Sequence, residues 1–383
     1  MSVLQPQQLP PWRRAVLKVG SNLLAADGGG LTPCFAKALA AFIATSHVAG
    51  REVVLVSSGA VAAGRALLHA RAAPGRDLAA RQAVAALGQA PMVALWQSLS
   101  ARPVAQVLLT HDDLRSRRRY LNARTTLRGL LALEALPVVN ENDTVAVDEL
   151  KLGDNDNLAA IVAALVDADL LLIASDVDAL YNADPRRDPT AMPIARVEAM
   201  SPAVMAMASG SSSAVGTGGM RTKLEAAEKA AAAGIPTALF DGRDAATVQA
   251  LAQGQLRGTL ICAPHGHMQA RKYWLLHAPA SSGRIHVDAG AARALGRGGA
   301  SLLPGGILAA DGEFQRGDLV EIVDADERRI ARGLSQYAAV EVRRLAGRHS
   351  REIQALLGYS HGAEVVHRDD LANLPDQPQA DLV

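Results

Sequence analysis

Two lysines of this 383-residue chain stand close to glycines, where their ammonium groups could meet a bound anion. Lys18 follows the apolar run "AVL" and precedes Gly20, and Lys223 lies within "GTGGMRTKLEAAEKAAAAG", residues 216–234. Glycines let backbone amides approach an anion, and a helix that begins near Met220 would add free N–H groups and the positive end of its dipole. The two lysines could neutralise opposite sides of a phosphoryl group during its transfer.

Each of these features also has a simpler explanation. A loop rich in glycine and serine can precede a surface helix without binding a ligand, and a lysine can end a strand in water. The spacing in residues 216–223 is neither the G-x-x-x-x-G-K-[ST] of a P-loop nor the G-x-G-x-x-G of a first βα unit. The sequence therefore supports neither a P-loop nor a Rossmann dinucleotide site.

The stretch "GDNDN", residues 153–157, places two carboxylates and two carboxamides ahead of the apolar run "LAAIVAALV". An EF-hand calcium loop that began at Asp154 would need an oxygen ligand at its fifth position, where this chain has Leu158. Asp156 or Asn157 can cap the following helix, but a cap needs only one such residue. The remaining polar side chains are available for a binding or catalytic role.

Two further polar clusters follow apolar runs. "SSGA", residues 57–60, comes after "VVLV", and "NEND", residues 140–143, comes after "PVV". Ser58 and Gly59 could offer a hydroxyl and an amide to a substrate, although an ordinary helix N-cap explains them equally well. Four polar residues directly after a buried strand are harder to explain as a turn alone.

The order of segments predicts an α/β fold, with a mainly parallel sheet sandwiched by helices. Short apolar runs such as residues 15–20, 52–59, 136–143 and 169–176 alternate with longer segments rich in alanine and leucine. In such a fold ligands bind beyond the carboxyl ends of the strands. The polar clusters fall where that rule expects them, after a strand or at the start of a helix.

The segment 264–282 interrupts the alternation and reads as a linker. Beyond it, short β-like pieces at residues 284–288, 318–324, 329–335, 339–344 and 363–367 predict a small β-rich domain. The expected organisation has five parts: a disordered lead-in over 1–12, a catalytic domain over 13–263, the linker over 264–282, the β-rich domain over 283–368, and a mobile tail over 369–383.

Composition excludes several classes of protein. Hydrophobic residues make up 49% and charged residues 20%, as in an ordinary globular protein, and the formal charge of +1 gives no overall attraction to nucleic acid or anionic membranes. The only two cysteines, Cys34 and Cys262, are far apart, which argues against a disulfide scaffold and a zinc site. Without a signal peptide or a membrane span in the sequence, we expect a cytoplasmic protein.

A series of motifs in this order resembles that of the amino acid kinase family: "VLKVGSN", "LVSSGAVAAG", "VNENDTVA", "GDNDNLAA", "IASDVDALY", "DPR" and "GTGGMRTKLEAA". Within the family the match is closest to the bacterial members that phosphorylate glutamate. The segments "ASLLPGGI" and "RIARGLSQY" look like the PUA domain that many of those members carry, so the resemblance runs from about Ala15 to His367.

The resemblance implies ATP-dependent phosphorylation of the γ-carboxylate of L-glutamate to L-glutamyl 5-phosphate, the first step of proline biosynthesis. It implies that Lys18 and Lys223 flank the transferring phosphoryl group and that Asp156 holds both lysines, while Asp154 has no assigned role. The positions matching glutamate-binding residues are Ser58, Asp143 and Asn155. The positions matching nucleotide-binding residues are Lys18, Ser175, Asp176, Thr217, Gly218, Gly219, Met220, Arg221, Thr222 and Lys223.

The resemblance also implies partners and cofactors. They are ATP with Mg²⁺, held through the ATP oxygens without a dedicated carboxylate cage in the protein. Proline is expected as a feedback inhibitor, the chain is expected to form a homo-oligomer, and the product would pass to glutamyl phosphate reductase.

Two other functions remain open from the sequence. The first is phosphorylation of acetylglutamate or aspartate by another member of the same family. The second is RNA binding through the PUA-like domain, but residues 283–368 hold 12 arginines, no lysine and 11 acidic residues. Because that balance gives no net basic surface, we do not expect nucleic acid as a partner.

Overall fold

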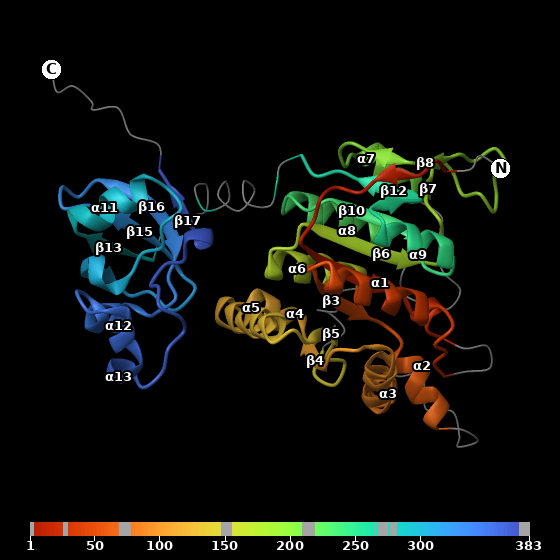
Figure 1. Cartoon of the computed structure of the whole chain (residues 1–383), viewed down its shortest axis with the longest axis horizontal. Coiled ribbons are helices and arrows are strands. Elements are labelled where there is room, and N and C mark those ends of the chain that lie inside the picture. The colour runs from red at the N-terminus through yellow and green to blue at the C-terminus, as the bar shows by residue number, and fades with distance from the viewer. Residues whose placement is uncertain are drawn as a thin grey trace. The chain divides into compact units, whose positions relative to one another are not determined.

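The chain forms two compact units, Met1–His267 and Met268–Val383, and each is described by itself (Figure 1). The computed structural model describes residues 4–25, 30–68, 78–146, 155–208, 219–264, 266, 275 and 282–374. Among these residues no helix is both long and apolar enough to cross a lipid bilayer.

The first unit is built on an eight-stranded sheet in the order β4-β5-β3-β2-β6-β10-β12-β9. Its strands are β2 (Arg14–Val19), β3 (Glu52–Ser57), β4 (Val104–Leu109), β5 (Leu136–Glu141), β6 (Leu170–Ser175), β9 (Arg196–Val197), β10 (Thr237–Asp241) and β12 (Gly258–Ile261). Neighbouring strands run parallel except at the β10–β12 pair. The predicted mainly parallel sheet is confirmed.

Helices cover both faces of this sheet (Figure 1). One face packs against α1 (Ala36–Val48), α3 (Leu78–Leu99) and α9 (Ala245–Ala252), and the other against α5 (Arg117–Ala132), α6 (Asn155–Val166) and α8 (Met220–Ala232). Successive side chains of a strand point to opposite faces, so in β2 Leu17 joins the first core and Val16 the second. Lys18 therefore points to the face that carries α6 and α8.

Shorter elements complete the first unit. They are β1 (Gln7–Gln8), η1 (Ser21–Leu23), α2 (Ala60–Leu67), α4 (His111–Arg115), β7 (Leu180–Tyr181), β8 (Pro193–Ile194), α7 (Pro202–Met207) and β11 (Gln255–Leu256).

The expected disorder of residues 1–12 is wrong for residues 4–12. Strand β1 pairs with β11, and Leu9 and Trp12 are buried in the first core. The guanidinium of Arg51 also lies 4.7 Å from the centre of the Trp12 ring. Apolar burial and strand pairing fix this segment, although its glutamines and prolines suggested a free end.

The second unit contains a five-stranded sheet in the order β14-β13-β15-β16-β17. Its strands are β13 (Gly283–Val287), β14 (Ile307–Gly312), β15 (Leu319–Val323), β16 (Arg329–Leu334) and β17 (Leu371–Asn373). Its helices are α11 (Ala289–Gly296), η3 (Pro304–Gly306), α12 (Ala339–Leu345), η4 (Ser350–Glu352), α13 (Ile353–Leu357) and η5 (Arg368–Asp370). The β-rich character predicted for this part of the chain is confirmed.

Three local predictions in the second unit are wrong. Residues 339–344 form helix α12 and not a strand, because Ala339, Val342 and Leu345 recur at helical spacing and fill the core. Residues 363–367 make only an isolated bridge between Leu302 and Val366. The expected mobility is wrong for residues 369–373, because β17 pairs with β16 and Asp370 is buried, while residues 375–383 of the expected tail lie outside the described residues.

Most of the expected linker, residues 264–282, lies outside the described residues. Within it, Leu275 is fully buried in a small cluster with Leu334 and Ala372 of the second unit.

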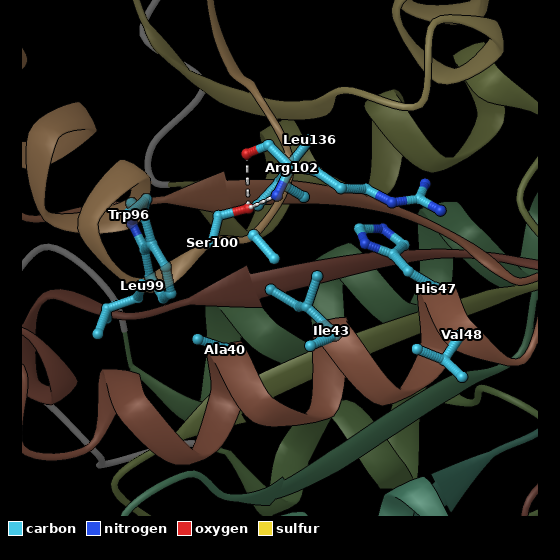
Figure 2. A pocket seen from close by; sticks show the side chains of 11 residues that line it. Ala40, Ile43, His47, Val48, Trp96, Leu99, Ser100, Arg102 and Leu136 are labelled. Carbon is cyan, nitrogen blue, oxygen red and sulfur yellow. Dashed lines mark hydrogen bonds between the residues drawn. The ribbon is translucent and has the colours of Figure 1, made fainter.

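A pocket of about 170 Å³ opens between α1, the end of α3 and the start of β5, at the amino ends of the strands (Figure 2). Its lining is mostly apolar, with His47 and Arg102 at one side. Burial, followed by the positive charge of Arg102, lowers the pKa of His47 to about 4, although Glu134 acts in the opposite direction. The imidazole is therefore neutral in the folded chain at pH 7.

We expect His47 to make the chain less stable as the pH falls from about 6.5 toward 4. Over that range the unfolded chain binds a proton at His47 and the folded chain does not, so the free energy of unfolding decreases. After a discount for solvent screening at this half-buried ring, the loss at pH 5 is about 1 kcal/mol. Urea unfolding at pH 7.5 and pH 5 should show that the free energy of unfolding decreases less in His47→Gln than in the unaltered chain. An equal decrease in both proteins would contradict the neutral state assigned to His47.

Candidate active site

Three buried charged side chains meet on one face of the first sheet, near the carboxyl end of β2. Lys18 lies on β2, Asp156 in the first turn of α6, and Lys223 in the first turn of α8. The Lys18 Nζ lies 2.5 Å from Asp156 Oδ1, and the Lys223 Nζ lies 3.4 Å from Asp156 Oδ2. The structure therefore brings together the three residues that the resemblance assigns to catalysis.

This cluster carries one more positive than negative charge. Asp156 is fully buried, and Lys18 and Lys223 are only 5% and 9% exposed. A buried charge without a counter-charge is costly, and one carboxylate can neutralise only one of the two ammonium groups. The three residues by themselves therefore favour an additional anion beside the two lysines, and the carboxylate of Asp176, which interacts with Lys223, offsets part of this positive charge.

The start of α8 adds further anion-binding groups. Thr222 Oγ1 lies 3.0 Å from Asp156 Oδ2 and accepts a hydrogen bond from the Gly219 N–H at 3.2 Å. The amides in the first turn of a helix have no partner within the helix, and the dipole is positive at this end. Thr222 thus joins the start of α8 to the charged cluster.

Asp176 lies directly after β6, which neighbours β2 in the sheet. Its Oδ2 accepts a hydrogen bond of 2.8 Å from the Asn22 amide, and Ser175 Oγ lies 3.3 Å from its Oδ1. Burial favours the protonated acid, but the bonds from Asn22 and the backbone and the charge of Lys223 outweigh it and lower the pKa of Asp176. The carboxylate is therefore ionised at neutral pH.

On the other side of β2 the polar groups are carboxamides and hydroxyls. Asn155 Nδ2 donates to Ser58 Oγ at 2.8 Å and to Asn140 Oδ1 at 2.9 Å. Ser58 follows β3 and Asn140 lies near the end of β5, so these groups share the carboxyl edge of the sheet with Lys18. Asp143, the third expected glutamate-binding residue, lies in the turn after β5 and is half-buried.

The remaining expected nucleotide-binding residues differ in position. Gly219 precedes α8, Met220 packs between two apolar clusters, and the side chain of Arg221 is mostly exposed and pairs with Glu225 at 2.9 Å. The Arg221 guanidinium therefore lies at the surface of α8. Residues Thr217 and Gly218 lie outside the described residues, as does Asp154.

Several polar residues beside the cluster were not identified from the sequence. Asn22 binds Asp176, and the guanidinium of Arg243 donates to the Asp176 carbonyl at 2.5 Å. Gln89 and Asn140 form a buried hydrogen bond of 3.3 Å. Asn22 follows β2, and Asn140 opens "NEND" at the end of β5, so position at or after the end of a strand was an available signal for both. No local pattern marks Gln89, which lies in the middle of α3.

The described residues contain no group of three or more histidine, cysteine or acidic side chains arranged to hold a metal ion. In the charged cluster the single carboxylate already contacts two lysines. A divalent ion in this part of the site would fit best as a companion of phosphate oxygens, which are the ligands that Mg²⁺ commonly takes.

A parallel sheet covered by helices, with two lysines around one buried carboxylate at its carboxyl edge, defines a site for a phosphoryl group or a similar anion. Residues 13–241 match the amino acid kinase family, and this chain belongs to that family. Residues 283–357 match the PUA domain.

Close relatives match nearly the whole chain. A protein of Xanthomonas oryzae pv. oryzae named Glutamate 5-kinase is 66% identical over 94% of this chain and 100% of its own length. A protein of the same name from Xylella fastidiosa is 64% identical over 96% of this chain and 97% of its own. Among solved structures, a carbamate kinase from Giardia lamblia bound to AMP-PNP is similar with a TM-score of 0.48 and 17% identity, over 65% of this chain and 98% of that one.

Proposed function

We propose that this chain transfers the γ-phosphoryl group of ATP to the γ-carboxylate of L-glutamate, giving L-glutamyl 5-phosphate and ADP, the first step of proline biosynthesis. The observation that carries this proposal is the buried cluster of Lys18, Asp156 and Lys223 with its one excess positive charge. The relatives named Glutamate 5-kinase, which match the chain over nearly its full length, support the choice of glutamate.

The reaction requires alignment and charge neutralisation and needs no general base. A glutamate carboxylate has a pKa near 4.3 and is already ionised at neutral pH. One of its oxygens forms a bond to the γ-phosphorus while the bond from that phosphorus to the β,γ-bridging oxygen breaks, and ADP leaves with the electron pair. Negative charge spreads over the phosphoryl oxygens during this step, where cations stabilise it.

Among the described residues, Lys18 and Lys223 are the cations that would stabilise this negative charge. They approach Asp156 from β2 and from α8, so their ammonium groups can contact the phosphoryl group from different directions. Asp156 is a positioning residue, because it holds both ammonium groups by ion pairs. Thr222 supports the same carboxylate and anchors it to the start of α8.

Glutamate and ATP would bind on opposite sides of Lys18. Ser58, Asn155 and Asp143 lie on the side of β3 and β5 and are proposed to bind glutamate. Ser175 and Asp176, after β6, and the start of α8 with Gly219 to Lys223 lie on the other side and are proposed to bind ATP. Thr217 and Gly218 belong to the same proposed segment but lie outside the described residues.

Mg²⁺ is proposed to enter with ATP and to neutralise charge on the phosphate oxygens. Since no acidic cluster of the described residues is arranged to hold it, ATP and water would supply most of its ligands.

Substrate choice is tested by measuring ADP release with L-glutamate, N-acetylglutamate and L-aspartate in parallel. We expect turnover with glutamate at least a hundredfold above the other two, together with a product that hydroxylamine traps as a hydroxamate. Faster turnover with N-acetylglutamate or aspartate would transfer the proposal to another reaction of the same family.

Three relationships with other molecules belong to the proposal through the family resemblance alone. They are assembly into a homo-oligomer, inhibition by proline in competition with glutamate, and transfer of the product to glutamyl phosphate reductase. Light scattering of the purified chain and glutamate titrations with and without proline test the first two. A cytoplasmic location is proposed on the same basis.

A further inference from the structure

Three carboxamide side chains form a hydrogen-bonded row from the middle of α3 to the proposed glutamate side of the site. Asn155 Nδ2 donates to Asn140 Oδ1 at 2.9 Å, and Asn140 Nδ2 donates to Gln89 Oε1 at 3.3 Å. Gln89 and Asn140 are buried, with 9% and 4% of their surface exposed. Buried amides of this kind keep the partners that the fold gives them, because losing one costs the desolvation of a polar group.

Both ends of the row lie against backbone carbonyls, which accept hydrogen bonds and never donate them. Gln89 Nε2 donates to the Glu141 carbonyl at 3.4 Å. The two hydrogens of Asn155 Nδ2 face Ser58 Oγ and Asn140 Oδ1, and the same nitrogen lies 3.4 Å from the Ser57 carbonyl. Reversing any one amide would set two NH₂ groups or two oxygens against each other. The orientation of all three carboxamides is therefore determined by the fold.

This orientation leaves the carbonyl oxygen of Asn155 for the ligand. Within the part of the chain that the structure describes, no group donates a hydrogen bond to Asn155 Oδ1. A carboxamide oxygen attracts a donor such as an ammonium group and repels a carboxylate. An amino-acid substrate carries both groups on its α-carbon, so the direction of this amide decides which of them it can contact.

We propose that Gln89 is a positioning residue that fixes the Asn155 carboxamide with its oxygen toward the α-ammonium group of the amino-acid substrate. The inference rests on the proposed function and adds to it a basis for selecting substrates with a free ammonium group. Without the Gln89 oxygen, Asn140 can reverse, and Asn155 can follow at the cost of its long contact with the Ser57 carbonyl. An NH₂ group would then face the ammonium. A hydrogen bond to a charged group corresponds to about 10- to 100-fold in affinity.

The test compares Gln89→Met with Gln106→Met. The Gln106 amide also donates to Gln89 Oε1, at 3.4 Å, but it lies on β4 outside the row that leads to Asn155. For each protein kcat and KM are measured with glutamate, with glutarate, which lacks the ammonium group, and with ATP. We expect Gln89→Met to raise the KM for glutamate at least tenfold, to lower the preference for glutamate over glutarate by a similar factor, and to leave the KM for ATP unchanged. In Gln106→Met the KM for glutamate, the preference for glutamate over glutarate and the KM for ATP should all stay unchanged.

A second variant separates polarity from packing. Gln89→Glu retains an oxygen that accepts from Asn140 but places a carboxylate against the Glu141 carbonyl, so it should lower the thermal midpoint and keep the preference for glutamate.

If Gln89→Met does not fold, Asn140→Leu removes the next acceptor in the row and should lose the preference for glutamate in the same way. A preference that stays unchanged in Gln89→Met, or in Asn140→Leu, would overturn the proposal. Absence of glutamate turnover in the unaltered chain would instead refute the proposed function.

Discussion

Asp156→Asn should lower kcat with glutamate by about a thousandfold, since the variant loses the carboxylate that holds Lys18 and Lys223. A neutral amide of the same shape cannot offset either ammonium charge, and two buried like charges then repel each other. Removal of one electrostatic group at a transition state typically costs a hundred- to a thousandfold, and here two lysines lose their position together. Steady-state ADP release measures the effect.

The same change should also destabilise the chain by about 3 kcal/mol, because it leaves buried charges without their partner. Asp167, just beyond the other end of α6, provides a matched control: it pairs with Arg124 at 2.9 Å and with Arg128, away from the charged cluster. Asp167→Asn should lose comparable stability and keep its turnover at a temperature where both variants are folded. Turnover of Asp156→Asn within tenfold of the unaltered chain would refute the assigned role.

Lys223→Ala is expected to lower kcat by about a thousandfold with only a modest change in the KM for glutamate. The ammonium group would act on the phosphoryl group during transfer, so its loss affects the transition state more than the binding of glutamate. Polar contacts around Ser58 and Asn155, which lie on the other side of Lys18, remain in the variant. Initial rates over a range of glutamate concentrations at saturating ATP separate kcat from KM.

Lys229 lies on the same helix and is the control for this experiment. Its Nζ donates to Asn157 Oδ1 at 2.6 Å and does not contact Asp156. Lys229→Ala should therefore reduce stability by about 1 kcal/mol, the size expected when a single hydrogen bond is lost, and leave kcat unchanged. Near-normal turnover in Lys223→Ala would show that this lysine has no part in the phosphoryl transfer.

The order of elements in the first unit could be predicted because each strand is a short apolar run and each helix a longer segment rich in alanine and leucine. Boundaries and the ends of the chain could not be predicted equally well. Strand β1 is fixed by a strand, β11, that lies nearly 250 residues later, and Trp12 is fixed by the core that it shares with Phe42 of α1. Residues 339–344 alternate like a strand, but the core of the second unit selects the helical face formed by Ala339, Val342 and Leu345.

The types of residue that the site uses were determined by the sequence alone. Lys18, Asp156 and Lys223 each stand after an apolar strand or at the start of a helix, and the carboxyl ends of neighbouring parallel strands must lie at one edge of a sheet. Two lysines beside glycines near that edge predict an anion site before any distance is known. The matching series of motifs then indicates the family.

Only the tertiary structure decided how these groups act on one another. Asp156 forms ion pairs with Lys18, which lies 138 positions earlier in the chain, and with Lys223, which lies 67 positions later. The direction of the Asn155 amide depends on Gln89, in a helix that no motif marks. Hydrogen-bond direction is a property of a complete network, because each amide is constrained by its neighbours and the network here ends on backbone carbonyls. Sequence therefore determined which groups are present at the site, and the packing of α3, α6 and α8 against the sheet determined which atom each group presents.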